Sequence, residues 1–149
     1  MASHCGYVEG SSNNPQSEFS VWKLGDFSGS GLIVGIELSG DPAIDGRKFL
    51  PVLKQARRAG LKVSIHLAEI SNQLDEVEEF LRFRPDRIGH GTFLHTRSEF
   101  INLMIQHRIP LEICLTSNVM SMTTSSIADS HLKFWRERSI PICLCVSFA

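Results

Sequence analysis

LKVSIHLAE (residues 61–69) is a short apolar run that ends in polar residues. Its length and its β-branched content are typical of a buried strand. Similar runs recur along the chain, and segments with apolar residues every three or four positions, typical of helices, separate them. The predicted strands are 32–38, 61–67, 86–90, 111–116 and 140–146, and the predicted helices are 45–59, 72–83, a segment that begins near Thr96 or Ser98, and 127–138.

Five strands that alternate with four helices through short loops indicate repeated βαβ units around a parallel sheet. Two α/β architectures satisfy this pattern: a doubly wound open sheet and an arc of a (β/α)8 barrel. A complete barrel takes about 250 residues, and this chain has 149. Ser, Asn and Gly dominate residues 1–31, which we expect to form a flexible leader.

The composition excludes two classes of partner. The chain has 15 Lys and Arg against 16 Asp and Glu, for a formal net charge of −1, so it lacks the bulk basic surface that nucleic-acid phosphates require. No apolar run approaches the roughly 20 residues of a membrane span, and the N-terminal residues do not resemble a secretory signal. We expect a soluble protein with no nucleic-acid or membrane partner.

The cysteines indicate the compartment. Cys5, Cys114, Cys143 and Cys145 form no CxxC pair, and three of them lie in otherwise apolar runs. Buried free thiols in a reducing environment explain this usage best. We therefore expect a cytoplasmic protein.

Polar residues follow four of the predicted strands. Because the carboxyl ends of parallel strands lie on one rim in both architectures, we expect a glycine, two histidines and a carboxyl group to converge there. The four polar stretches are Ser39-Gly40-Asp41, His66 to Glu69, His90-Gly91-Thr92 and Thr116-Ser117-Asn118.

Each candidate also has a purely structural interpretation. His66 faces away from its two apolar strand neighbours and is compatible with a satisfied core histidine. Glu69 is compatible with a charge that favours a helix start, and His90, which stands between two glycines, with a turn residue. Gly40 and Gly91 are compatible with unusual backbone dihedrals. No single position decides between a site and a structural role.

The motifs taken together are more specific. SGDP (39–42), HLAE (66–69) and RIGHGT (87–92), in this order at successive strand ends, resemble the adenosine deaminase family. GIELSGDP (35–42), LTSNV (115–119) and HLKFW (131–135) extend the resemblance over about residues 32–141. The family's fold is a (β/α)8 barrel of the metal-dependent hydrolase type. The resemblance therefore implies a partial barrel of about five βα units over residues 32–149.

The resemblance also implies an activity. The family uses Zn²⁺ to hydrolyse the C6 amino group of adenine nucleosides or nucleotides, here N6-methyl-AMP to IMP, and a monomer is implied for the full-length protein. His66 matches the family's zinc histidine, and Glu69 matches the acid that protonates the purine ring nitrogen. His90 matches the histidine beside the zinc-bound water, and Gly40 matches the glycine whose backbone contacts the base.

Two parts of the family pattern are absent from the sequence. The chain contains no His-x-His, which supplies two zinc ligands in the family, and no Asp-Asp, where it reads CLCVSFA (143–149) instead. A catalytic zinc has about three protein ligands. Cys143 or Cys145 can substitute chemically, but both lie in an apolar strand. Two alternatives to an active deaminase therefore stay open: a catalytically inactive truncated isoform or fragment, and a small α/β nucleotide-binding domain.

Overall fold

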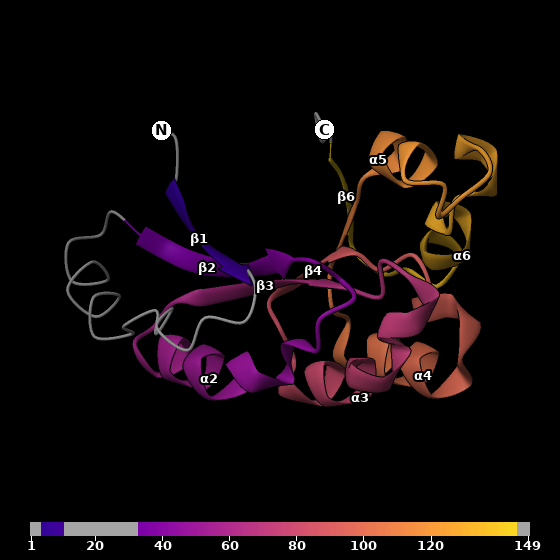
Figure 1. Cartoon of the computed structure of the whole chain (residues 1–149). Coiled ribbons are helices and arrows are strands. Elements are labelled where there is room, and N and C mark those ends of the chain that lie inside the picture. The colour runs from indigo at the N-terminus through magenta and orange to yellow at the C-terminus, as the bar shows by residue number, and fades with distance from the viewer. Residues whose placement is uncertain (1–3, 11–32, 146–149) are drawn as a thin grey trace.

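One parallel sheet organises the fold. The computed structural model describes residues 4–10, by their backbone, and residues 33–145. Within these residues six strands lie side by side in chain order, and every neighbouring pair is parallel (Figure 1). The strands are β1 (His4–Gly10), β2 (Ile33–Gly40), β3 (Lys62–Leu67), β4 (Arg87–His90), β5 (Leu111–Ile113) and β6 (Ile142–Leu144).

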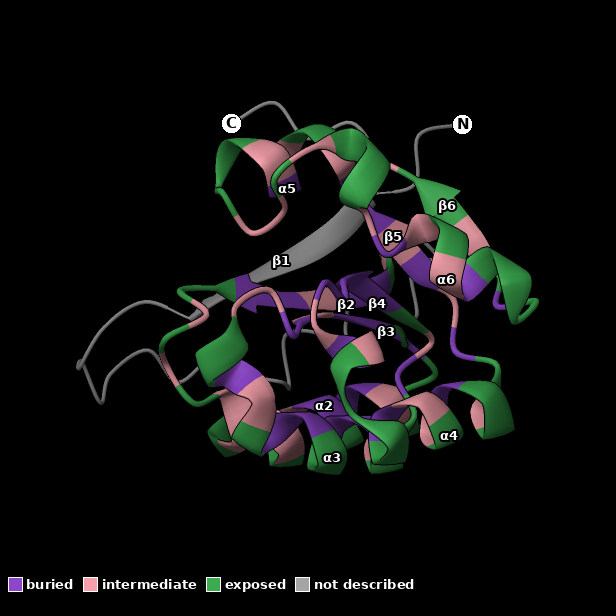
Figure 2. Ribbon diagram, turned by 90° about the vertical axis from the view of Figure 1, so that its right-hand side faces the viewer, coloured by how far each residue is buried: buried purple, intermediate pink, exposed green. Residues whose placement is uncertain are grey.

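The helices of the described residues and the order of the strands distinguish between the two predicted architectures, the doubly wound sheet and the arc of a barrel. They are α2 (Leu50–Arg58), α3 (Leu74–Phe83), α4 (Ser98–His107), α5 (Leu115–Met120) and α6 (Leu132–Glu137), with four short 3₁₀ turns, η1 (Gly46–Phe49), η2 (Ser71–Gln73), η3 (Leu94–Thr96) and η4 (Ile127–Asp129). Helices α2, α3 and α4 lie along one side of the sheet, and their buried residues face it (Figure 2). A doubly wound sheet reverses its strand order at a switch point, whereas this order runs without reversal. The sheet is an arc of a barrel, as the family resemblance implied.

Helix α2 shows how the local sequence sets a boundary. The predicted helix 45–59 begins at Leu50, because Pro51 lacks an N–H and is tolerated only in the first turn. Gly60 follows the helix with a φ of +85°, as expected for a glycine just past a helix end. The amide of Leu61 then donates to the carbonyl of Ala56 and closes the helix.

Two predicted boundaries near the C-terminal end were wrong. Predicted strand 111–116 ends at Ile113, and helix α5 begins at Leu115. The apolar run continues through this change, and periodicity alone does not separate a short buried strand from a helix. Predicted helix 127–138 is two pieces, η4 and α6, because Ser130 between them has an extended backbone.

The predicted leader is also corrected in part. Residues 4–10 form strand β1, whose backbone pairs with β2 from His4 opposite Ile33 to Gly10 opposite Gly40. Pairing with a distant strand gives these residues a structure that their own composition does not favour. Residues 1–3 and 11–31 of the predicted leader lie outside the described residues.

The core fills the space between the sheet and its helices. The largest fully buried side chains include Trp135 and Phe80. The free cysteines of the described residues differ from the prediction: Cys114 is buried and Cys145 is half-buried, but Cys143, on the edge strand β6, is exposed. In the described part of the chain, no helix has the length and apolar character needed to cross a membrane.

Candidate functional site

The site lies at the carboxyl ends of β3 and β4. Along β3, Val63 and Ile65 are fully buried against the helices, whereas His66 points to the opposite face and is half-buried. In the adjacent strand Gly89 lies directly opposite His66. The predicted facing of His66 is thus confirmed, and its ring lies over a strand position that carries no side chain.

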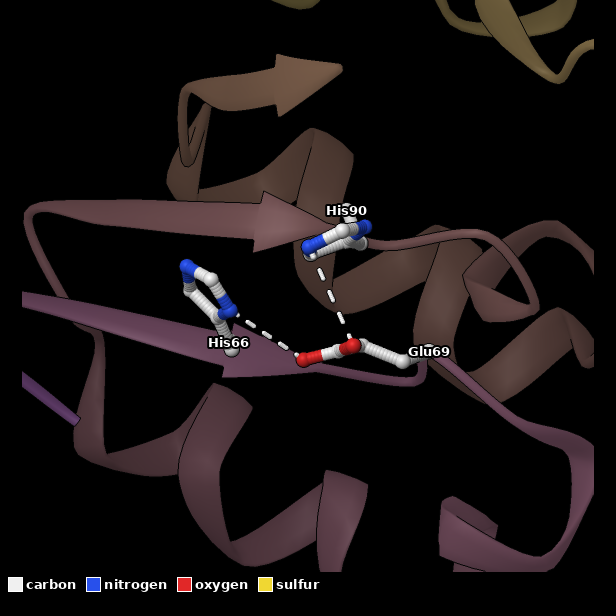
Figure 3. A group of neighbouring side chains, drawn as sticks. All are labelled: His66, Glu69 and His90. Atoms are coloured by element: carbon white, nitrogen blue, oxygen red, sulfur yellow. Dashed lines mark ion pairs between the residues drawn. The ribbon is translucent and has the colours of Figure 1, made fainter. Parts of the chain in front are cut away.

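Three of the predicted site residues come together. His66 Nδ1 lies 3.2 Å from Glu69 Oε1, and His90 Nε2 lies 3.8 Å from Glu69 Oε2 (Figure 3). The two imidazole rings meet edge to face with their centroids 4.8 Å apart. One ligand atom from each of the three side chains lies within 4.8 Å of the others. Two histidines and a carboxyl group therefore lie close together at the carboxyl ends of β3 and β4.

Unusual backbone conformations turn the chain at this point. Ala68 and His90 have φ values of +54° and +61°, in the left-handed region that non-glycine residues rarely adopt. Such conformations cost about 1–3 kcal/mol each and persist only where the surroundings hold them. Here the amide of Gly91 donates to Leu67 and that of Phe93 to Ala68, which ties the two strand ends together.

A second carboxylate, Glu37 on β2, also binds His66. Its Oε1 lies 2.8 Å from His66 Nε2. Burial would lower the pKa of His66, but hydrogen bonds to Glu37 and Glu69 outweigh it and raise that pKa to about 9. The hydrogen bond with His66 in turn lowers the pKa of Glu37. Glu37 was not among the predicted site residues, although it is the only charged residue in the apolar run 32–38.

His90 is held from two sides by buried residues. Asn118 Oδ1 lies 2.9 Å from His90 Nδ1, and His131 Nε2 lies 2.8 Å from the carbonyl oxygen of His90. Asn118 was a polar candidate without a role, and His131 was part of a family motif only. Thr116, in the same predicted polar stretch as Asn118, is exposed.

Gly40 lies in the wall of a pocket beside this group. The pocket is also lined by His66, Glu69 and Phe49, but not by His90. Gly40 has a φ of +141°, a conformation that glycine tolerates best. Gly40 thus has the unusual backbone dihedral that was expected of it, and it lies in the wall of the pocket.

Glu69 is held in place through its backbone. Its amide donates to Gln73 Oε1 over 2.9 Å, and Gln73 Nε2 donates to Glu76 Oε1 over 2.8 Å. The other oxygen of Glu76 accepts the amide of Gly46. Buried Glu76 thus links the loop that follows β2 to the loop that carries Glu69.

The donor types suit a transition metal. Zinc binds imidazole nitrogen and carboxylate oxygen in proteins, and His66, Glu69 and His90 offer two imidazoles and one carboxylate. Both nitrogens of His66 face carboxylates, so a cation at this point would replace a proton there. The residues present fit a divalent cation by chemical type.

Comparison with known proteins agrees with the motifs. The adenosine deaminase family model matches residues 13–146. An adenosine deaminase-like protein of Caenorhabditis elegans is 52% identical over 115 residues, which are 76% of this chain and 30% of that protein. The N6-methyl-AMP deaminase of Homo sapiens is 46% identical over 123 residues, which are 79% of this chain and 35% of that protein. The chain thus spans about a third of the length of these curated relatives.

Solved structures share the fold. The structure of Arabidopsis ADAL complexed with GMP matches 95% of this chain, and 41% of its own, with a TM-score of 0.83 and 32% identity. The apo structure of the N6-methyl-AMP deaminase from Arabidopsis thaliana matches 95% of this chain and 41% of its own, with a TM-score of 0.80 and 30% identity. Since the family model covers most of the sequence, the chain belongs to the adenosine deaminase family.

Proposed function

We propose that this chain supplies part of the active site of a zinc-dependent deaminase that acts at C6 of adenine nucleotides, with N6-methyl-AMP as substrate. The observation that carries the proposal is the convergence of His66, Glu69 and His90 at two adjacent strand ends. Relatives named N6-methyl-AMP deaminase and a related structure complexed with GMP support the substrate class.

Each residue of the group has a role in this reaction. Water adds at C6 of the purine, the bond from C6 to the methylamino nitrogen breaks, and the products are IMP and methylamine. Glu69 protonates the ring nitrogen that receives electron density during the addition. His90 orients the water and stabilises the charge that develops on it. The backbone of Gly40 contacts the base in the neighbouring pocket.

His66 is the proposed zinc ligand in the described part of the chain. A zinc ion bound there would act as a Lewis acid and make water nucleophilic near neutral pH. Glu37 positions the imidazole of His66 through the 2.8 Å contact at Nε2. Carboxylates that orient metal-binding histidines are a general feature of such sites.

The test combines metal content with product analysis. The purified chain is loaded with zinc, dialysed, analysed for metal and incubated with N6-methyl-AMP or adenosine. We expect bound zinc, and release of methylamine with IMP from N6-methyl-AMP or of ammonia with inosine from adenosine. His66→Ala abolishes both, whereas Glu69→Gln abolishes product formation and retains zinc. His107→Gln, at the end of α4, is the matched control and changes neither.

Two results would contradict the proposal in different ways. A chain that binds no zinc and releases no product is an inactive member of the family. A chain that binds purine nucleotides equally well with and without a chelator acts as a small nucleotide-binding domain.

A further inference from the structure

We propose that Asn118 holds the neutral imidazole of His90 in the tautomer that carries its proton on Nδ1, so that Nε2 presents a lone pair toward Glu69. Asn118 is a positioning residue in this proposal, because it acts through His90. The tautomer is inferred from the contact of Oδ1 of Asn118 with Nδ1 of His90, whereas its importance for catalysis rests on the proposed deaminase function.

The contact between the two side chains is buried and specific. Asn118 and His90 have exposed fractions of 1% and 8%, and 2.9 Å separates Oδ1 of Asn118 from Nδ1 of His90. A carboxamide oxygen accepts hydrogen bonds and cannot donate them. With Oδ1 of Asn118 on the His90 side, the proton in this contact belongs to Nδ1 of His90.

The backbone of Asn118 is fixed independently of its side chain. Its amide donates to the carbonyl of Cys114, and its own carbonyl accepts the amides of Thr123 and Thr124. The hydroxyl groups of Ser121 and Thr123 donate to the same carbonyl. These bonds keep the side chain of Asn118 beside His90.

The main chain of His90 is fixed as well. His131 donates from Nε2 to the carbonyl oxygen of His90, which has a left-handed backbone with a φ of +61°. With Nδ1 hydrogen-bonded to Asn118, the other ring nitrogen of His90 forms no hydrogen bond among the described residues. That nitrogen, Nε2, lies 3.8 Å from Oε2 of Glu69 and faces the His66 ring (Figure 3).

The amide group of Asn118 offers one competing arrangement. Its Nδ2 is buried and has no hydrogen-bond partner among the described residues. If the amide were reversed, Nδ2 would donate to Nδ1 of His90, and the ring proton would lie on Nε2. The two arrangements therefore predict opposite tautomers, which an experiment can distinguish.

A lone pair on Nε2 has a chemical consequence. In this tautomer His90 accepts a hydrogen bond, or a proton, from a water molecule beside it. In the opposite tautomer it only donates, and it cannot take a proton from water. Asn118 thereby determines which of two roles His90 has in the proposed reaction.

NMR determines the tautomer of His90 directly. Long-range ¹H–¹⁵N spectra of the chain, labelled in its histidines, distinguish a protonated from a bare ring nitrogen. They are recorded at alkaline pH. The His90 signals are identified by their loss in His90→Gln. We expect a protonated Nδ1 and a bare Nε2, with a preference of about tenfold.

Two substitutions test the role of Asn118. Asn118→Asp keeps an acceptor oxygen, so Nδ1 stays protonated. Asn118→Leu has a similar volume and no acceptor, so the tenfold preference is lost and Nε2 becomes protonated in a large fraction of molecules. If Asn118→Leu does not fold, the wild-type and Asn118→Asp spectra still decide the question.

The proposal is overturned by a proton on Nε2 in the wild-type chain, whether Nδ1 is bare or also protonated. An unchanged tautomer in folded Asn118→Leu overturns it too. The spectra need neither metal nor substrate. A chain that lacks deaminase activity but shows the Nδ1 proton therefore contradicts only the proposed function.

Discussion

Gly89 provides the space in which the imidazole of His66 lies. A Cβ atom at Gly89 would come within 2.5 Å of Cδ2 and 3.0 Å of Nε2 of His66. The two residues are direct neighbours in the pairing of β3 with β4. Since Glu37 and Glu69 bind the two ring nitrogens, the ring has little freedom to move away.

Gly89→Ala should therefore displace the His66 ring. We expect the 2.8 Å contact with Glu37 to break, the pKa of His66 to fall from about 9 toward its ordinary value of 6.5, and stability to fall by about 1–3 kcal/mol. NMR titration of His66 and chemical denaturation measure the two effects. Ile88→Val, on the helix-facing side of the same strand, should reduce stability by roughly 1 kcal/mol and leave the His66 pKa unchanged.

The hydrogen bonds of His66 also predict how stability depends on pH. The pKa of His66 is raised from 6.5 to about 9 in the folded chain. The added stability is therefore complete below about pH 6.5 and is lost as the pH rises through about 9. It amounts to roughly 3 kcal/mol at most.

Glu37→Gln tests this dependence. Urea denaturation of the variant should show a weaker loss of stability above pH 6.5 than the wild-type chain, because a neutral amide stabilises the imidazolium less. Glu79→Gln, an exposed carboxylate on α3, is the control and should follow the wild-type profile. Equal profiles for wild type and Glu37→Gln would contradict the assigned pairing.

His131 should act in the opposite direction. Burial lowers its pKa to about 4, and its Nε2 must stay protonated to donate to the carbonyl of His90. Between about pH 6.5 and 4, His131 is therefore protonated in the unfolded chain and neutral in the folded chain. The free energy of unfolding falls as the pH drops through this range. The loss reaches roughly 3 kcal/mol at the lower end.

His131→Gln should remove this acid sensitivity. The amide nitrogen of glutamine can reach the position of Nε2, and it does not titrate. We expect a flatter stability profile between pH 6.5 and 4, measured by urea denaturation at each pH. His107→Gln replaces a less buried ring whose pKa is also lowered by burial, and it should flatten the profile less than His131→Gln. A wild-type slope in His131→Gln would show that another group causes the acid sensitivity.

The alternation of strands and helices was predictable because its signals are local. Apolar runs such as 61–67 and the periodic segment of α3 carry their pattern within a few residues. Strand β1 had no such signal, since its structure depends on pairing with β2, more than 20 residues away in the chain. The break between η4 and α6 was also missed.

The candidate site was predictable for the residues that stand at strand ends. His66, Glu69, His90 and Gly40 could be placed on one rim from the sheet topology alone. Glu37 and His131 could not, because their roles depend on contacts across the fold. The hydrogen bond from His131 to the carbonyl of His90 joins residues 41 positions apart in the chain, and a short sequence motif does not predict such a contact.

The link between Gly46 and Glu69 gives a last prediction. Glu76 accepts the amide of Gly46 over 2.5 Å and a proton of Gln73, which in turn accepts the amide of Glu69. Glu76→Ala leaves two donors without an acceptor, the buried side chain of Gln73 and the half-buried amide of Gly46, which costs about 1–3 kcal/mol. Both amides, Gly46 and Glu69, should then exchange with solvent faster than in the wild-type chain.

Glu76→Gln distinguishes the loss of these hydrogen bonds from a general loss of stability. Its amide oxygen can serve only one of the two donors, so we expect faster exchange at either Gly46 or Glu69 and a smaller loss of stability than in Glu76→Ala. Glu79→Ala, one turn further along α3 and exposed, should leave both amides protected. Hydrogen exchange followed by NMR at these amides measures the effect. Unchanged protection at Glu69 in both Glu76 variants would mean that Gln73 holds this backbone without help from Glu76.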